Sequence, residues 1–224
     1  MKTSKILSVC LTIVCVNFST RSQGFVNLNF ENATITPVVP NFIYASNSIP
    51  GWTAYLDGKS QDGIFYDGVS AGGAIICLED TNVPNGIPFP IQGSYSVLLE
   101  GASGVFGNNP TTASIGQTGT IPVSAQSLTF WDSQNNGTLQ VTFNGQPLTI
   151  MDISNALNYT VYGADISPFA GQTGQLLFTS PLQTAALLDN IQFSSVPVPE
   201  PSEFALAALG ALFLGFRRWR NSAR

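Results

Sequence analysis

Short apolar runs alternate with clusters of Gly, Pro, Ser, Thr and Asn through the middle of the chain. No stretch between residues 23 and 195 repeats apolar positions at the three- and four-residue spacing of an amphipathic helix. Runs rich in β-branched and aromatic residues and bounded by turn residues are typical of strands. We therefore expect strands at 25–31, 52–56, 73–78, 95–100, 113–117, 127–131, 138–143, 148–153, 160–165, 175–178 and 186–193.

The dipeptide Asn144-Gly145 marks one hairpin between these runs. Both residue types tolerate the positive φ angles of a tight turn, although the following Gln146-Pro147 suggests a looser loop. In the run before the turn, apolar residues alternate with polar ones, which predicts one buried and one solvated face. The apolar positions are Leu139, Val141 and Phe143.

About ten such strands over roughly 170 residues predict an all-β domain, with two antiparallel sheets packed as a sandwich, of jelly-roll type. A core of this size folds without disulfides. We find no internal repeat in the sequence, which argues against a solenoid or a propeller.

Charge is scarce in this sequence, at 9% of residues, and it is unevenly placed. Between Gln23 and Val198, Lys59 is the one cation beside eleven acidic residues, so nucleic-acid binding is excluded. The chain has no histidine, which excludes Ser-His-Asp and Cys-His catalysis and imidazole metal sites. Cys77 lies within an apolar run as the only cysteine of the expected domain, so we expect a buried, inert thiol.

The first 22 residues have the pattern of a secretion signal peptide. Lys2 and Lys5 precede an apolar run over 6–18, and the small residues Thr20 and Ser22 precede a mature start near Gln23. We therefore expect a signal helix over 1–22 and the β-sandwich domain over 23–195.

Three distinct segments follow at the other end of the chain. Residues 196–203 form a Pro-rich, extended linker that contains Pro199-Glu200-Pro201. The apolar run 204–216 predicts a helix of about 20 Å, short for a hydrocarbon core of about 30 Å. The tail 217–224 is basic and is expected to stay in the cytoplasm. Its arginines include Arg217, Arg218 and Arg220.

This order of a Pro-Glu-Pro motif, a short apolar helix and an arginine cluster resembles the PEP-CTERM sorting signal of Gram-negative bacteria. The resemblance implies that an exosortase, a membrane protease-transpeptidase, removes the tail. It also implies passage from the inner membrane to the cell surface or extracellular matrix. The alternative is an ordinary C-terminal membrane anchor, although such anchors are usually longer.

Four short motifs are spread through the domain: Asn27-Leu28-Asn29-Phe30-Glu31, Ile49-Pro50-Gly51-Trp52, Gln92-Gly93-Ser94-Tyr95-Ser96-Val97 and Leu188-Asp189-Asn190-Ile191. Together they resemble galactose-binding-like jelly rolls, the fold of many carbohydrate-binding modules. The resemblance implies that the first and last strands run near each other, and that an acid on each helps to hold a structural calcium ion. The matching acids here are Glu31 and Asp189; the alternative is that Glu31 caps a turn and Asp189 faces solvent.

Exposed aromatic rings beside Asn, Gln and Asp side chains are the usual platforms for sugar rings. Trp131 fits this pattern because polar residues follow it directly, and Tyr66 is a second aromatic candidate; packing in the core is the alternative for each ring. The candidate ligand-binding residues are Trp131, Asp132, Asn135 and Tyr66.

We expect a non-enzymatic exported protein whose β-sandwich contacts polysaccharide. A carbohydrate-active enzyme is one alternative, and the acidic pairs Glu79-Asp80 and Asp62 with Asp67 are its candidate carboxylates, although their spacing establishes no cleft. A purely structural matrix component without a defined ligand is another.

Overall fold

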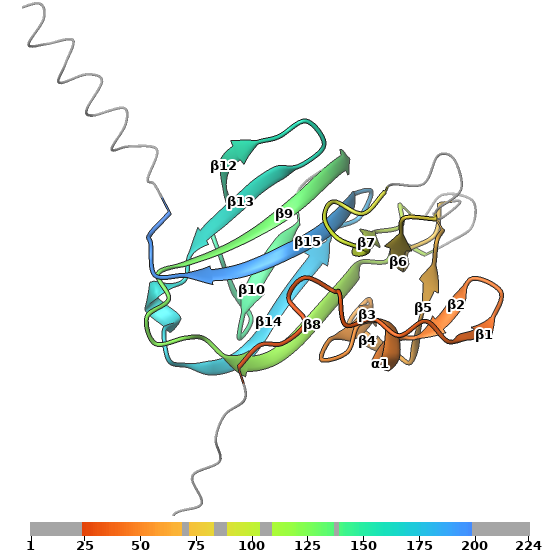
Figure 1. Cartoon of the computed structure of the whole chain (residues 1–224), viewed down its shortest axis with the longest axis horizontal. Coiled ribbons are helices and arrows are strands. Elements are labelled where there is room, and N and C mark those ends of the chain that lie inside the picture. The colour runs from red at the N-terminus through yellow and green to blue at the C-terminus, as the bar shows by residue number, and fades with distance from the viewer. Residues whose placement is uncertain (1–23, 69–71, 83–88, 104–108, 137–138, 199–224) are drawn as a thin grey trace, which may run out of the picture.

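The computed structural model describes residues 24–68, 72–82, 89–103, 109–136 and 139–198 (Figure 1). The expected signal peptide, the Pro-Glu-Pro motif, the apolar run 204–216 and the basic tail lie outside these residues. Within the described residues, no helix combines the length and apolar character needed to cross a bilayer.

The described residues form two β-sheets that pack face to face, so the expected all-β, two-sheet sandwich is confirmed (Figure 1). The larger sheet has nine strands within the described residues, in the order β1-β2-β5-β6-β7-β15-β9-β13-β12. The smaller has six within the same residues, in the order β11-β10-β14-β8-β3-β4. Neighbouring strands in the described residues are antiparallel except β5 and β6, which are parallel.

The strand bounds are as follows. The larger sheet contains β1 (Pro37–Val39), β2 (Phe42–Tyr44), β5 (Gly63–Tyr66), β6 (Ile75–Asp80), β7 (Tyr95–Glu100), β9 (Ser127–Asn136), β12 (Met151–Asn155), β13 (Thr160–Asp165) and β15 (Ala185–Ser194). The smaller sheet contains β3 (Thr53–Leu56), β4 (Lys59–Gln61), β8 (Ala113–Thr120), β10 (Gln140–Phe143), β11 (Gln146–Pro147) and β14 (Thr173–Ser180). Among the described residues, α1 (Ala45–Ser48) and η2 (Ser167–Phe169) are short helices that lie in connections.

The main core fills the space between the two sheets. We call the side of the larger sheet that faces this core its inner face. Phe130 of β9 and Phe178 of β14 meet there with ring centroids 5.2 Å apart in an edge-to-face arrangement. Trp52 packs against Phe178 and is 4% exposed, so it belongs to this core. Burying side chains of this size stabilises a fold by roughly 1.5–3 kcal/mol each.

The opposite side of the larger sheet, its outer face, carries a second apolar cluster. Ile75, Cys77, Leu98 and Leu187 are buried there, and Ile91 packs against them. All six residues of β6 are buried because this strand is covered on both faces. The expectation of a buried Cys77 thiol is therefore confirmed, and burial raises its pKa, which suppresses the reactive thiolate.

Several sequence expectations are met and others are wrong. The strand expected at 148–153 begins only at Met151, as β12. Strands 95–100 and 160–165 appear unchanged as β7 and β13. The Asn144-Gly145 hairpin is present with φ angles of 49° and 76°, but Gln146 pairs directly with Phe143, so the looser loop is wrong. The strand expected at 25–31 is also wrong: Asn27 and Phe30 have φ angles of 50° and 59°, which turn the chain.

The chain stays on the surface of the larger sheet after β15 ends. The Ser127 hydroxyl donates to the Val196 carbonyl oxygen at 2.7 Å. Val198 is 8% exposed, and its Cγ2 lies 3.1 Å from where a Cβ on Gly163 would stand. Val198 of the expected linker therefore packs against the sandwich, whereas the Val196 side chain is exposed.

Candidate functional site

Two stacked aromatic rings mark one end of the outer face. Trp131 of β9 and Tyr159 have ring centroids 4.4 Å apart at an interplanar angle of 13°. The register places Val161 opposite Trp131, so Tyr159, two residues earlier, projects from the same face. The turn that carries Tyr159 is closed by the Ala156 N–H, which donates to the Tyr159 carbonyl oxygen at 2.8 Å. Trp131 thus supports the Tyr159 ring from behind.

A pocket of about 440 Å³ adjoins this pair, and we call it the platform pocket. Its polar groups are hydroxyls and an exposed amide, and the hydroxyl of Thr160 donates to Asn155 Oδ1 at 2.7 Å. An aromatic face beside uncharged hydrogen-bonding groups suits a polyhydroxylated ring. The pocket is lined by Ser133, Ala156, Leu157, Asn158, Tyr159 and Thr160.

Asp132 lies on the opposite side of the sheet from Trp131. Adjacent residues of a strand point to opposite faces, and Asp132 follows Phe130 toward the inner face, where it is 0% exposed. Among the described residues, neither carboxylate oxygen has a partner within hydrogen-bond distance. Burial raises the pKa of Asp132 to about 7, against the opposing effect of the Leu139 backbone N–H. A ligand that contacts Trp131 therefore does not reach Asp132. Asn135 belongs to β9, but its side chain lies outside the described part of the structure.

Tyr66 does not join this site. It lies at the end of β5, four strands from β9, a separation of roughly 19 Å across the sheet. Its hydroxyl donates a short hydrogen bond to the Asp80 carboxylate. Burial, together with this hydrogen bond, raises the Tyr66 pKa. Tyr66 therefore acts in a local contact between β5 and β6.

Glu31 and Asp189 are brought together by the segment before β7. Glu31 Oε1 accepts the N–H groups of Ser94 and Tyr95 at 2.9 and 3.1 Å. Asp189 Oδ2 accepts from the Gln92 N–H and the Ser96 hydroxyl at 3.0 and 2.8 Å. Burial raises the pKa of Asp189 to about 6, although these donors oppose the shift. The two carboxylates hold this segment against the outer face.

These donors decide whether the residues suit a calcium ion. Calcium requires six to eight oxygen ligands, whereas Glu31 Oε1 and Asp189 Oδ2 each accept two hydrogen bonds from N–H or O–H groups of the chain. Within the described residues, no three or more His, Cys, Asp and Glu side chains are placed to hold a metal ion. The surroundings of Glu31 and Asp189 therefore do not fit the calcium site that the jelly-roll resemblance implies.

The acidic pair Glu79-Asp80 does not form a catalytic cleft. Glu79 is 0% exposed on the outer face, and neither of its carboxylate oxygens has a partner within hydrogen-bond distance among the described residues. Burial raises its pKa to about 7, against the opposing effect of the Cys77 thiol and the Gly68 backbone N–H. Asp80 points the other way and is held by Tyr66 and Asn82. Asp67 accepts the Asp80 N–H at 3.0 Å, while Asp62 is exposed. Asp67, Glu79 and Asp80 serve the packing of β5 and β6, and none of the four carboxylates lines the platform pocket.

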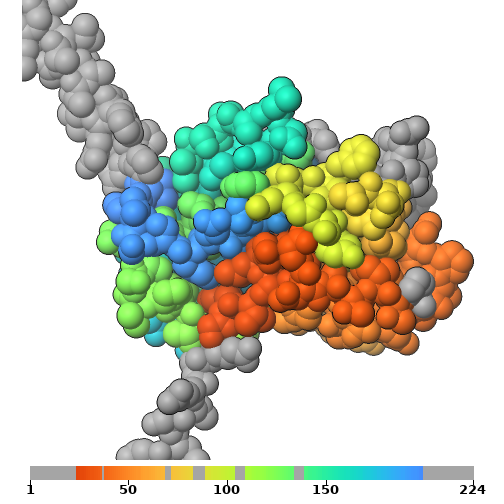
Figure 2. Space-filling model, in the orientation of Figure 1, coloured from red at the N-terminus to blue at the C-terminus, as the bar shows by residue number. Residues whose placement is uncertain are grey.

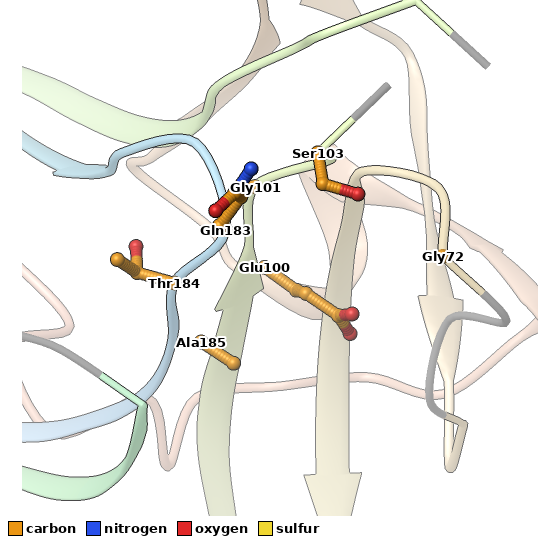
Figure 3. A pocket seen from close by; sticks show the side chains of 7 residues that line it. All are labelled: Gly72, Glu100, Gly101, Ser103, Gln183, Thr184 and Ala185. Atoms are coloured by element: carbon orange, nitrogen blue, oxygen red, sulfur yellow. The ribbon is translucent and has the colours of Figure 1, made fainter. Parts of the chain in front are cut away.

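A second pocket, of about 420 Å³, lies where β7 ends and β15 begins (Figure 3). We call it the Glu100 pocket. Figure 3 shows the Glu100 side chain reaching across from β7, with Thr184 and Ala185 on the other side. Polar residues at strand ends look like ordinary turns in the sequence, which is why sequence reasoning did not identify this pocket. Its lining residues are Gly72, Glu100, Gly101, Ser103, Gln183, Thr184 and Ala185.

Comparisons with known proteins give only distant likenesses. No family model and no curated protein matches the chain. The carbohydrate-binding module TmCBM61, solved with β-1,4-galactotriose, is 14% identical at a TM-score of 0.40, covering 77% of this chain and 99% of its own. The family 11 carbohydrate-binding module from Clostridium thermocellum, solved with a β-1,3-1,4-mixed-linked tetrasaccharide, is 10% identical at a TM-score of 0.33, covering 73% of this chain and 100% of its own.

A third likeness is to an enzymatically active domain, that of tailspike protein 4 from bacteriophage CBA120. It is 16% identical at a TM-score of 0.36, covering 65% of this chain and 19% of its own. Identities and TM-scores this low assign neither a family nor a ligand.

Proposed function

We propose that this protein is a non-enzymatic polysaccharide-binding protein, with a sandwich of the galactose-binding-like jelly-roll type. The observation that carries the proposal is the Trp131–Tyr159 stack, with Tyr159 lining an uncharged polar pocket. Sugar rings present apolar C–H faces and hydroxyl edges, and this site offers an aromatic ring and hydrogen-bonding groups to match them.

The support that Trp131 gives to Tyr159 matters for affinity. An aromatic side chain that is already held in one orientation loses little conformational freedom when a ligand stacks on it. Tyr159 therefore makes the direct contact, and Trp131 is a positioning residue.

Binding to neutral polysaccharides tests this proposal. Affinity electrophoresis of the protein through gels that contain galactan, mixed-linked β-glucan, xylan or mannan should show retardation by at least one of them. We expect Tyr159→Ala to weaken that binding about tenfold or more, a loss of about 1.4 kcal/mol or more. Tyr44→Ala is the matched control, because Tyr44 is an exposed tyrosine (49%) on the same sheet, at β2. Equal losses in both variants, or no retardation by any polymer, would count against the proposal and favour a purely structural role.

We also propose that the protein is exported and sorted to the cell surface or extracellular matrix of a Gram-negative bacterium. The support is the sequence order of Pro199-Glu200-Pro201, the apolar run 204–216 and the arginines Arg217, Arg218 and Arg220. The processing partner is an exosortase, and the inner membrane is a transient location.

Fractionation with intact-mass analysis, in cells with and without the exosortase, tests the sorting proposal. The tail beyond about Pro201 should be lost only where the enzyme is present. Full-length chain in the inner membrane of normal cells would instead indicate the ordinary membrane anchor.

A further inference from the structure

The platform pocket and the Glu100 pocket open on the same face of the same sheet. Glu100 and Ala185 are cross-strand partners, and they alternate with Leu99 and Ala186 of the main core, so both lie on the outer face. Ser133 of the platform pocket lies on that face too, because it follows the inward-facing Asp132.

The two pockets are also close. Ser133 pairs with Leu187, which is two residues from Ala185 on β15. Diagonal neighbours of this kind on adjacent strands are separated by about 7–8 Å. The pockets therefore occupy four consecutive strands, β7, β15, β9 and β13, at the same end of the sheet. Figure 2 shows that the β12–β13 hairpin projects from the body beside this region.

The Glu100 pocket differs from the platform pocket in its chemistry. Its functional groups are one carboxylate, two hydroxyls and one amide, and its described lining includes no aromatic ring. These groups can hydrogen-bond hydroxyls but cannot supply a stacking surface. A pocket of this kind suits a ring that is already held nearby by another contact.

The charges around the pockets restrict the ligand. Lys59 is the one Lys or Arg within residues 24–198, and it lies on β4, at the edge of the other sheet. No cation of the described residues is therefore placed to balance an acidic sugar, and Glu100 would repel its carboxylate.

We propose that the Glu100 pocket is a second subsite for the same polysaccharide chain, and that the two subsites together select uncharged chains over acidic ones. This inference rests on the proposed function, since the platform pocket supplies the first contact. Two linked contacts raise the affinity for a chain long enough to reach both, while a short oligosaccharide gains nothing.

The test uses oligosaccharides of increasing length, made from whichever of galactan, mixed-linked β-glucan, xylan or mannan retards the protein. Ala185→Gln fills the Glu100 pocket from a strand position. Thr118→Gln is the matched control, because Thr118 is an exposed strand residue of β8 in the other sheet. Titration calorimetry should show that the natural protein gains about tenfold or more in affinity as the chain lengthens. Ala185→Gln should lose that gain and keep its affinity for short chains, whereas Tyr159→Ala should weaken both.

The outcomes separate this inference from the function on which it rests. If the natural protein binds none of the polymers, the proposed function fails and the second subsite with it. If the protein binds but Ala185→Gln behaves like Thr118→Gln at every length, the second subsite is refuted while the function stands.

Charge selection has its own test. At low salt, polygalacturonate should bind at least about tenfold more weakly than the best neutral polymer. Glu100→Gln should reduce this ratio of affinities. Thermal unfolding checks that the variant is folded. Equal binding of polygalacturonate by the natural protein would overturn the selection of uncharged chains.

Discussion

The buried carboxylate of Asp132 should make this protein less stable as the pH rises. Its pKa in the folded protein is about 7, raised by burial, whereas an aspartate in an unfolded chain titrates near pH 4. The folded state therefore holds the proton more tightly than the unfolded state. The stability that the folded state gains from this tighter proton binding is fully present below about pH 4 and is lost as the pH rises through about 7.

The size of this effect follows from the two pKa values. Relative to low pH, the ionisation of Asp132 lowers the free energy of unfolding by roughly 2 kcal/mol at pH 5 and by roughly 4 kcal/mol at pH 8. The difference between these two pH values is about 2–3 kcal/mol. For a domain of this size, that corresponds to roughly 5–10 °C in the melting temperature.

Asp132→Asn removes the titrating group and so should remove this part of the pH dependence. Urea unfolding of the purified protein, followed by tryptophan fluorescence at pH 5 and pH 8, gives the two free energies for each variant. We expect the free energy of unfolding of the variant, relative to that of the natural protein, to be about 2–3 kcal/mol higher at pH 8 than at pH 5. Glu79 and Asp189 also have raised pKa values, but both remain in the two proteins, so their contributions cancel.

Asp152→Asn is the control, because Asp152 is an exposed acid in the same sheet, on β12, two strands from β9. The free energy of unfolding of this control variant should differ from that of the natural protein by the same amount at both pH values. If Asp132→Asn also shifts stability by the same amount at pH 5 and pH 8, burial does not hold the proton on Asp132, and the reasoning is refuted.

Two further changes test other parts of the structure. Glu31→Ala removes the acceptor of two N–H groups, so we expect a loss of about 1–2 kcal/mol and faster hydrogen exchange at Ser94 and Tyr95. Chelation by EDTA should leave the melting temperature unchanged, and a drop of several degrees would instead indicate a bound metal. Gly101→Ala would place a Cβ 2.0 Å from the Pro181 carbonyl oxygen, so we expect a loss of about 1–3 kcal/mol. Gly24→Ala, where a Cβ meets nothing within 4 Å, should be neutral in the same thermal melts.

The fold was predictable where strands are long and their pattern is clear. The alternation over Leu139, Val141 and Phe143 predicted which side chains of the β10 region are buried. The short strands β2 and β5 were missed because neither run shows a clear period. β3, which is as short, lies within the strand expected at 52–56. The error at 25–31 arose because Asn27 and Phe30 adopt positive φ angles, which strand-forming composition does not reveal.

The candidate site was predictable only in part. Trp131 and Asp132 follow the apolar Leu128 and Phe130, and composition did not show which of the two would point outward. Tyr159 was not identified because its partner lies on another strand, and only the pairing of β9 with β13 brings their rings together. The Glu100 pocket likewise depends on the pairing of β7 with β15.

The packing of Val198 has a mechanical consequence for any processing of the tail. The Pro-Glu-Pro tripeptide begins at the next residue, so no slack chain separates it from the folded body. A protease that binds a longer extended peptide would first have to separate Val198 from Gly163. Exposing a buried valine side chain costs about 1.5 kcal/mol of free energy. Replacing Val198 with a polar residue would lengthen the extended segment that a protease can bind, while the Pro-Glu-Pro motif itself stays unchanged.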